Sequence, residues 1–278
     1  MIGGIELGGT KCVVALAESP DKIISKEQIA TKDPESTFVD ISSFFDGHNV
    51  ENLGIGSFGP IVLDFKSKDY GLLVTESKKG WGGINIVERL SKICSNIFID
   101  TDVNAAALGE YIYGAGKLCD NLVYVTIGTG IGVGILLKGI PHLGNFHVEA
   151  GHMRIPNVDA IPGVCKIHGD CWEGLASGPA IQMRCKSNIE EMSETNEIWD
   201  EEAKLLAFGL INIISTYSPD RIILGGGVMK QSILLPQIIT YVKEIWNNYT
   251  PLIDLNDLIV GPGLDQNSGI IGSLALTL

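Results

Sequence analysis

The stretch "IGGIELGGTKCVVALA" (Ile2–Ala17) contains two apolar runs separated by a glycine turn. Its β-branched residues resume directly after Lys11, which is the pattern of a strand, a tight turn and a second strand. The stretch "NLVYVTIGTGIGVGILL" (Asn121–Leu137) repeats this pattern in the second half of the chain. The repetition indicates two related halves, although a single sequence does not prove a duplication.

Length and composition limit the classes of protein that this chain can belong to. Its 278 residues suffice for one large domain or two medium ones, and its 45% apolar and 19% charged residues are ordinary for a globular enzyme. A net charge of −13 disfavours binding to phosphate backbones and to anionic lipid surfaces. We therefore predict neither a nucleic-acid partner nor a membrane partner.

The start of the chain and its cysteines bear on where the protein works. Gly3, Gly4 and Glu6 interrupt any early apolar run, so we expect no secretory signal peptide. The six cysteines show no dense disulfide framework, which favours a reducing cytoplasm. The segment Asn121–Leu137 is shorter than the roughly 20 apolar residues of a membrane helix.

Apolar spacing predicts several further elements. Periodic apolar positions indicate helices, and short apolar runs between polar residues indicate strands. We expect strands over 53–64, 97–99 and 221–227, and helices over 82–96, 105–113, 177–186, 197–217, 231–248 and the last twelve residues.

Three glycine turns, "GGTK" (Gly8–Lys11), "GTGIG" (Gly128–Gly132) and "GGGVM" (Gly225–Met229), each follow an apolar strand. Glycine allows close backbone approach, so consecutive N–H groups can converge on a phosphate oxygen, and Lys11 adds a positive charge. A tight hairpin is the simpler interpretation of any one turn, but three in one chain favour nucleotide binding. The chain contains no P-loop motif.

Two segments with acidic and metal-ligating residues have open interpretations when taken alone. Asp102 lies where a predicted strand meets a predicted helix, so it fits a helix cap as well as a general base. Cys165, His168 and Cys171 form C-x2-H-x2-C, with His152 thirteen residues upstream of the first cysteine. These four residues have the side chains that a tetrahedral zinc site requires, although such spacing also arises by chance.

The motifs "GGIELGGTK", "DVNAAALGE", "TIGTGIGVG", "GVCKIHGDCWEGLASGPAI" and "IILGGGVM" together resemble the ROK sugar kinases, and most closely their fructokinase branch. The resemblance extends over nearly the whole chain. It implies an α/β, actin/hexokinase-like (ribonuclease H-like) fold, with two α/β domains around a cleft that holds ATP and a hexose. We expect a small N-terminal domain over 1–117 plus 265–278, and a large domain over 118–264 with a zinc-binding loop over 142–173.

The resemblance also implies roles for individual residues. Asp102 corresponds to the general base, and Asp100 would be a solvated or capping acid. Glu6 would hold Mg²⁺ through water, in a position where many relatives carry Asp. Sugar contacts are expected at Glu149, His152, Glu173 and Asn104, and structural zinc at His152, Cys165, His168 and Cys171. ATP contacts are expected at Gly8, Gly9, Thr10, Lys11, Gly128, Thr129, Gly130, Pro179, Gly225, Gly226, Gly227, Val228 and Met229. His142 and His147 receive no role.

The expected activity is transfer of the γ-phosphoryl group of MgATP to D-fructose, giving fructose 6-phosphate, by a cytoplasmic homodimer. Thr101 replaces the Asn that glucokinase-type relatives carry before the base, and Ser77 stands where fructokinase-like sequences carry Pro. The alternatives are a mannokinase or glucokinase of the same family, or a non-catalytic sugar sensor. Sensors of this family carry a DNA-binding segment before the kinase-like part, and we expect none here because the first predicted strand begins at Ile2.

Overall fold

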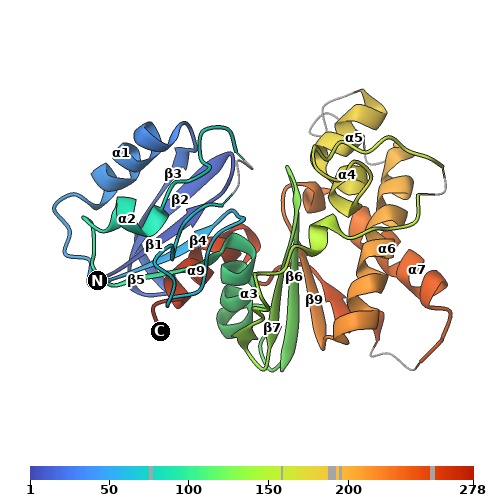
Figure 1. Ribbon diagram of the computed structural model, residues 1–278. Coiled ribbons are helices and arrows are strands. Elements are labelled where there is room, and N and C mark those ends of the chain that lie inside the picture. Colours follow the sequence, from blue (N-terminus) through green and yellow to red (C-terminus); the bar gives the residue numbers. More distant parts are fainter. Residues whose placement is uncertain (75–77, 158, 187–191, 194–195, 251–253) are drawn as a thin grey trace. The chain divides into compact units, whose positions relative to one another are not determined.

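The computed structural model (Figure 1) divides the chain into two compact units. The first unit comprises Met1–Lys117, Ile140–Val148 and Gly263–Leu278, and the second comprises Leu118–Gly139 and Glu149–Pro262. The structure describes residues 1–74, 78–157, 159–186, 192–193, 196–250 and 254–278, so Ser77 lies outside the described residues. The sequence-based division placed residues 140–148 in the second domain, whereas their contacts group them with the first unit.

A five-stranded sheet forms the centre of the first unit, in the order β3-β2-β1-β4-β5. β1 pairs antiparallel with β2, which pairs antiparallel with β3, whereas β1, β4 and β5 are parallel. The strands are β1 Ile2–Leu7, β2 Lys11–Ser19, β3 Lys22–Ala30, β4 Asn52–Ser57 and β5 Ile97–Thr101. Because parallel strands need crossover connections, helical segments lie between β4 and β5 and around them.

The helices of the first unit begin at residues suited to capping. Asp33 accepts a hydrogen bond from the Ser36 backbone N–H, and Pro34 occupies the first turn of α1, where its missing N–H costs nothing. α3 and α9 pack together and against β4. The elements are α1 Pro34–Phe45, α2 Ile86–Leu90, α3 Asp102–Tyr113, β8 Ile140–Pro141, the 3₁₀ turn Asp265–Asn267 and α9 Ser268–Ala275.

In the second unit, β6 pairs antiparallel with β7 and parallel with β9, and β9 pairs parallel with β10. The longest helix, α6, buries Leu206, Leu210 and Ile213 along one side, at the spacing of a helix face. The elements are β6 Asn121–Ile127, β7 Ile131–Leu137, β9 Arg221–Gly225, β10 Ile259–Val260, α4 Trp172–Ala176, α5 Gly178–Cys185, α6 Ile198–Tyr217, α7 Leu234–Trp246, α8 Leu255–Leu258 and the 3₁₀ turns Ala150–His152 and Val228–Lys230.

Most of the predicted elements are confirmed, including both strand–turn–strand openings. The predicted helix over 82–96 is shorter, since only Ile86–Leu90 is helical, and α3 begins three residues before the predicted Ala105. The predicted strand over 53–64 is regular only to Ser57 and is followed by a cis Gly59–Pro60 bond. The sequence pattern did not reveal β3, because an exposed edge strand carries polar residues on both faces.

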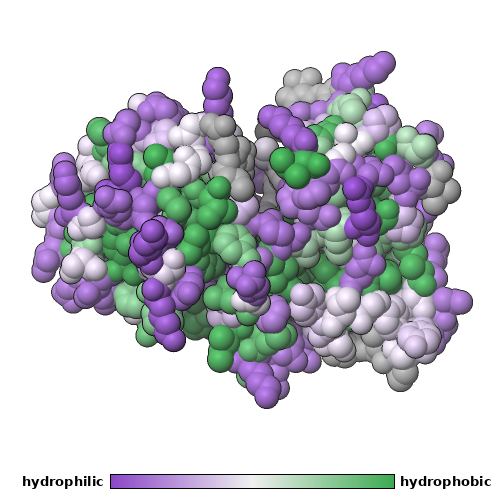
Figure 2. All heavy atoms as spheres, in the orientation of Figure 1, coloured by the Kyte–Doolittle hydropathy of each residue, from purple (hydrophilic) through white to green (hydrophobic). Residues whose placement is uncertain are grey.

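Large apolar side chains are buried in the core, whereas the surface carries both polar and apolar residues (Figure 2). Trp81 is fully buried in the first unit, where it contacts Phe38 and Phe58 edge-on or tilted. Trp172 and Trp199 are fully buried in the second unit. Among the described residues, no helix combines the length and the apolar character needed to cross a bilayer.

Candidate functional site

The first unit brings one glycine turn and Asp102 to the same edge of its sheet. In the parallel pairs, Leu7 lies opposite Ser57, and Ser57 lies opposite Thr101, so β1, β4 and β5 end at one level. The turn that begins at Gly8 follows β1, and Asp102 follows β5 without an intervening loop. Open α/β sheets bind ligands at the carboxyl ends of such strands. This edge is therefore the candidate site in the first unit.

The Gly8–Lys11 turn is held by surrounding hydrogen bonds. The Gly8 N–H donates to the Lys11 carbonyl at 3.0 Å, and the Thr31 hydroxyl donates to the Gly8 carbonyl at 2.8 Å. The Lys78 ammonium donates to the Gly9 carbonyl at 2.8 Å. Because Thr31 and Lys78 bond the Gly8 and Gly9 carbonyl groups, the turn has a defined backbone conformation. Gly9, Thr10 and Lys11 are nevertheless exposed.

Glu6 lies on β1, and its Oε2 atom is buried without a hydrogen-bond partner among the described groups. Burial raises the pKa of this carboxyl, and the positive charges of Lys11 and Lys26 partly oppose that effect. A buried, unsatisfied carboxylate oxygen is costly unless a cation or a donor reaches it. The chemistry of this oxygen fits Mg²⁺ or its bound water.

At the junction of β5 and α3, Thr101 caps the helix, since its hydroxyl accepts from the Asn104 backbone N–H at 3.1 Å. Asp102 is the first helical residue, and its Oδ1 accepts from the Val103 N–H at 2.9 Å. The prediction of a solvated acid at Asp100 is wrong, since Asp100 is only 7% exposed. Its Oδ1 accepts from the Thr101 backbone N–H and from the Asn104 side-chain amide at the start of α3.

The other two glycine turns meet in the second unit. β6 and β9 run parallel with Thr126 opposite Gly225, so the turn Gly128–Gly130 and the segment Gly225–Met229 leave the sheet at the same edge. Gly226 has φ +94°, and a Cβ there would lie 2.3 Å from the Ile127 carbonyl oxygen, so the position requires glycine. The Gly128 carbonyl also accepts from the N–H of Gly178, the first residue of α5. Pro179 follows it and is exposed.

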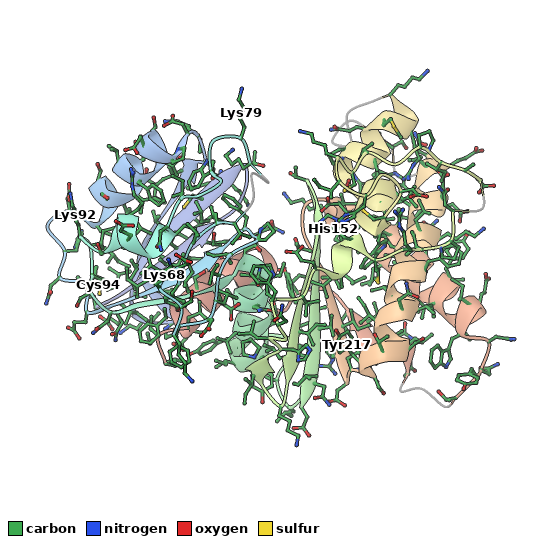
Figure 3. All side chains as sticks on the ribbon, in the orientation of Figure 1. Lys68, Lys79, Lys92, Cys94, His152 and Tyr217 are labelled. Atoms are coloured by element: carbon green, nitrogen blue, oxygen red, sulfur yellow. The ribbon has the colours of Figure 1, made fainter. Side chains whose placement is uncertain are left out.

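The four predicted zinc ligands come together in the second unit, and Figure 3 shows the place of His152. One ligand atom from each of His152, Cys165, His168 and Cys171 lies within 4.8 Å of the others. The His152 Nδ1 atom is 3.8 Å from Cys165 Sγ and 3.6 Å from Cys171 Sγ. The His168 Nδ1 atom is 3.9 Å from Cys165 Sγ. Zinc bond lengths place neighbouring sulfur and nitrogen ligands of a tetrahedron about 3.6 Å apart, so this donor set fits Zn²⁺.

Acidic residues lie beside the His/Cys cluster. The second ring nitrogen of His152 is 3.9 Å from Glu149 Oε2. Burial, together with the charge of Glu173, raises the pKa of Glu149 to about 7. Glu173 accepts a hydrogen bond from the Ile131 N–H at 3.0 Å, which ties α4 to the first residue of β7. The arrangement places two carboxylates and an imidazole where they could bind a polyhydroxylated ligand.

His147 and Glu110 are among the buried polar residues that sequence reasoning missed. His147, which received no role, accepts at Nε2 from the Ile61 N–H at 3.0 Å and is 7% exposed. Glu110 is fully buried, and its carboxylate accepts from three backbone N–H groups and from the Ser268 hydroxyl. No local motif marks either residue, because Ile61, Gly263, Leu264 and Ser268 are distant in the sequence from the side chains they bond.

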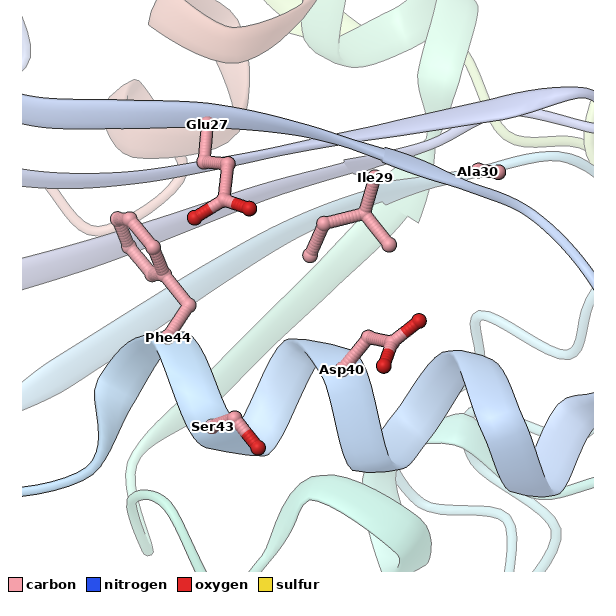
Figure 4. Close-up of a pocket in the computed structure, with 6 residues that line it drawn as sticks. All are labelled: Glu27, Ile29, Ala30, Asp40, Ser43 and Phe44. Carbon is pink, nitrogen blue, oxygen red and sulfur yellow. The ribbon is translucent and has the colours of Figure 1, made fainter.

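A hollow of about 420 Å³ lies between β3 and α1 of the first unit (Figure 4). It is lined by Glu27, Ile29, Ala30, Asp40, Ser43 and Phe44. None of these is a predicted site residue, and Lys32 pairs with Asp40 at 3.1 Å. The hollow is open and does not gather catalytic side chains, so we assign the chemistry to the strand edges.

Comparisons with known proteins agree with this architecture. A fructokinase of Lactococcus lactis subsp. cremoris is 41% identical over 254 residues, which cover 90% of this chain and 87% of that protein. A fructokinase of Pediococcus pentosaceus is 37% identical over 279 residues, which cover 99% and 97%. The crystal structure of a ROK family glucokinase from Streptomyces griseus, in complex with glucose and AMPPNP, matches with a TM-score of 0.81 at 24% identity, covering 99% of this chain and 98% of that one.

These likenesses confirm the fold class predicted from the sequence, two α/β domains of the actin/hexokinase-like type. The model of the ROK family matches residues 2–278, which is nearly the full length of the chain. This protein is therefore a member of the ROK family.

Proposed function

We propose that this protein is an ATP-dependent hexose kinase that transfers the γ-phosphoryl group of MgATP to the 6-hydroxyl of D-fructose. The fructokinases that match it at 37% and 41% identity over most of their length support this substrate. The observation that carries the proposal is the position of Asp102, at the same edge as a glycine turn, where the parallel strands β1, β4 and β5 end.

Asp102 is the proposed general base. A sugar hydroxyl that attacks ATP needs a positioned carboxylate to accept its proton, while the transferred phosphoryl group needs its charge neutralised. The hydrogen bond from the Val103 N–H holds one carboxylate oxygen of Asp102 in place. The other oxygen is the one we assign to the sugar hydroxyl.

The sugar is bound by Glu149, His152, Glu173 and Asn104 in this proposal. His152 Nε2 lies 3.9 Å from Glu149 Oε2, so in this proposal both face the same sugar, while the other ring nitrogen, Nδ1, faces the metal. Zinc bound by His152, Cys165, His168 and Cys171 stabilises this loop and takes no part in the chemistry. Burial raises the pKa of the Cys171 thiol to about 11, so a cation is needed to favour its thiolate.

The glycine turns are the proposed phosphate and nucleotide contacts. Gly8, Gly9, Thr10 and Lys11 serve in the first unit, and Gly128–Gly130, Pro179 and Gly225–Met229 serve in the second. Two observations support this assignment: the turns follow parallel or paired strands, and a hydrogen bond joins Gly128 to the start of α5. Glu6 is the proposed residue that orders Mg²⁺ through water.

The proposal includes a cytoplasmic homodimer that acts on small molecules. Its nearest competitor is a kinase for mannose or glucose, and a non-catalytic sugar sensor is a competitor of another class. Thr101 favours fructose over glucose, because its hydroxyl is used as the cap of α3 and offers no side-chain amide to the sugar. The sensor hypothesis gives no reason for a carboxylate at the position of Asp102, because a protein that only binds sugar needs no general base.

The test is ADP release by the purified protein with MgATP and fructose, mannose, glucose or N-acetylated hexosamines. We expect fructose to be turned over fastest, and Asp102→Asn to abolish turnover while fructose binding, measured by calorimetry, persists. Faster turnover of another sugar would replace fructose and leave the role of Asp102. Full activity of Asp102→Asn would exclude Asp102 as the base.

A further inference from the structure

Asp100 is a buried acid that the proposed reaction does not use, although it lies two residues before the proposed base. Its Oδ1 atom accepts two hydrogen bonds of 2.7 Å, one from the Thr101 N–H and one from the side-chain amide of Asn104. Asp100 lies on β5, and Asn104 lies in the first turn of α3. The bond therefore joins the end of the strand to the start of the helix that carries Asp102.

This bond determines which atom Asn104 can present to a ligand. A carboxylate oxygen only accepts hydrogen bonds, so the amide nitrogen of Asn104 must face Asp100 and its carbonyl oxygen must face away. The reversed amide would place two oxygens in contact. The backbone N–H of Asn104 is held as well, by the Thr101 hydroxyl at 3.1 Å, and the residue is 3% exposed. Asn104 thus has one orientation, with an oxygen acceptor on the side away from Asp100.

We propose that Asp100 is a positioning residue, which holds Asn104 so that its amide oxygen accepts a hydrogen bond from a hydroxyl of the bound sugar. This inference rests on the proposed function, because it takes Asn104 as a sugar contact. Removing this buried acceptor would leave the Thr101 N–H and the Asn104 amide without their shared partner, which is costly in the interior.

The test compares Asp100→Val, which removes the acceptor, with Asp100→Asn, whose amide oxygen can still accept both bonds. We expect Asp100→Val to raise the KM for fructose about five- to tenfold, the value of one hydrogen bond, with a smaller change in the KM for ATP. Asp100→Asn should recover most of this loss. Asp220→Asn is the matched control, since Asp220 also accepts two hydrogen bonds, from the Asp120 and Asn121 N–H groups, in the second unit.

The double variant Asp100→Val/Asn104→Ala separates positioning from general damage. If Asp100 acts through Asn104, the double variant should have the same KM for fructose as Asn104→Ala alone. Multiplied effects of the two changes, or an equal rise in the KM for ATP, would overturn the inference. Should Asp100→Val not fold, Asp100→Ala carries the same expectation with a smaller side chain.

Failure of the proposed function has a different signature. If the unmodified protein turns over no hexose but binds fructose by calorimetry, the same variants are compared by their dissociation constants, with the same expected ratios. In that case the kinase reaction is rejected, and the role of Asp100 stands or falls on the binding data. If the unmodified protein binds no sugar, the inference about Asp100 is rejected together with the proposed function.

Discussion

The substitution Gly209→Ala tests how the packing of α6 supports the His/Cys cluster. Gly209 faces the buried indole ring of Trp172, and a Cβ at residue 209 would lie 2.0 Å from Cε2 and 2.4 Å from Cδ2 and Cζ2 of that ring. Trp172 is the first residue of α4, and it lies between Cys171, a proposed zinc ligand, and Glu173, a proposed sugar ligand. A methyl group on α6 therefore pushes directly on this segment.

The expected loss of stability is the balance of two effects. Alanine in the interior of a helix is favoured over glycine by about 1 kcal/mol. Ordinary contact requires a separation of at least 3.4 Å, so the ring or the helix must move by about 1.4 Å. Overpacking of this kind costs about 3 kcal/mol at the upper end of its usual range. We expect a net loss of about 2 kcal/mol, or a fall in Tm of about 4–8 °C.

The assay is urea unfolding of the metal-loaded protein, together with zinc affinity by competition with a chelator. Gly261→Ala is the control for the glycine-to-alanine change, since a Cβ at residue 261 would meet nothing within 4 Å. Trp172→Leu should partly rescue Gly209→Ala, so that the double variant loses less stability than the two single losses together. A Gly209→Ala protein as stable as the unmodified one, with unchanged zinc affinity, would refute this account of the packing.

Three further predictions concern other parts of the molecule. Burial lowers the pKa of His147, so the unfolded chain binds the proton first as the pH falls. The free energy of unfolding should therefore fall as the pH drops below about 6.5. His147→Gln should lack this pH-dependent loss when urea unfolding is compared at pH 7.5 and 5.5. Arg184→Met leaves the fully buried Glu202 without its cation and should lower the free energy of unfolding by about 3–5 kcal/mol. The double change Arg184→Met/Glu202→Leu should recover most of this stability. An Arg184→Met protein of full stability would contradict this account. Cys165→Ser should reduce bound zinc from about one equivalent to below half, by metal analysis of protein purified without chelator, and unchanged zinc would remove Cys165 from the ligand set.

Much of the fold could be predicted from local patterns. Apolar runs around a glycine turn predicted both strand pairs, and 3.6-residue spacing predicted α6 and α7, since side-chain period alone distinguishes these elements. The ligand-bearing loop could be predicted for a similar reason. Cys165, His168 and Cys171 are close in the sequence, and a short loop allows their side chains few arrangements.

The candidate site was only partly visible at that level. The sequence pattern predicted that Asp102 and the glycine turns lie at strand ends. It did not predict that Asp100 is buried and hydrogen-bonded to Asn104. A hydrophilic residue at the end of a predicted strand can face water or a helix, and the choice depends on where α3 begins. That helix begins at Asp102 because Thr101 caps it, three residues earlier than the apolar spacing predicts.

The linear chain thus revealed the strand pairs, the helix periods, the glycine turns and the C-x2-H-x2-C motif, because each depends on residues a few positions apart. The sequence could not predict that Ile140–Val148 belongs to the first unit. That grouping depends on contacts such as that of His147 with Ile61, 86 residues away. The burial of Glu110 likewise requires Gly263 and Leu264, 153 and 154 residues further on. A polar side chain is stable in the interior only where such distant groups satisfy its hydrogen bonds, and only the folded chain brings those groups together.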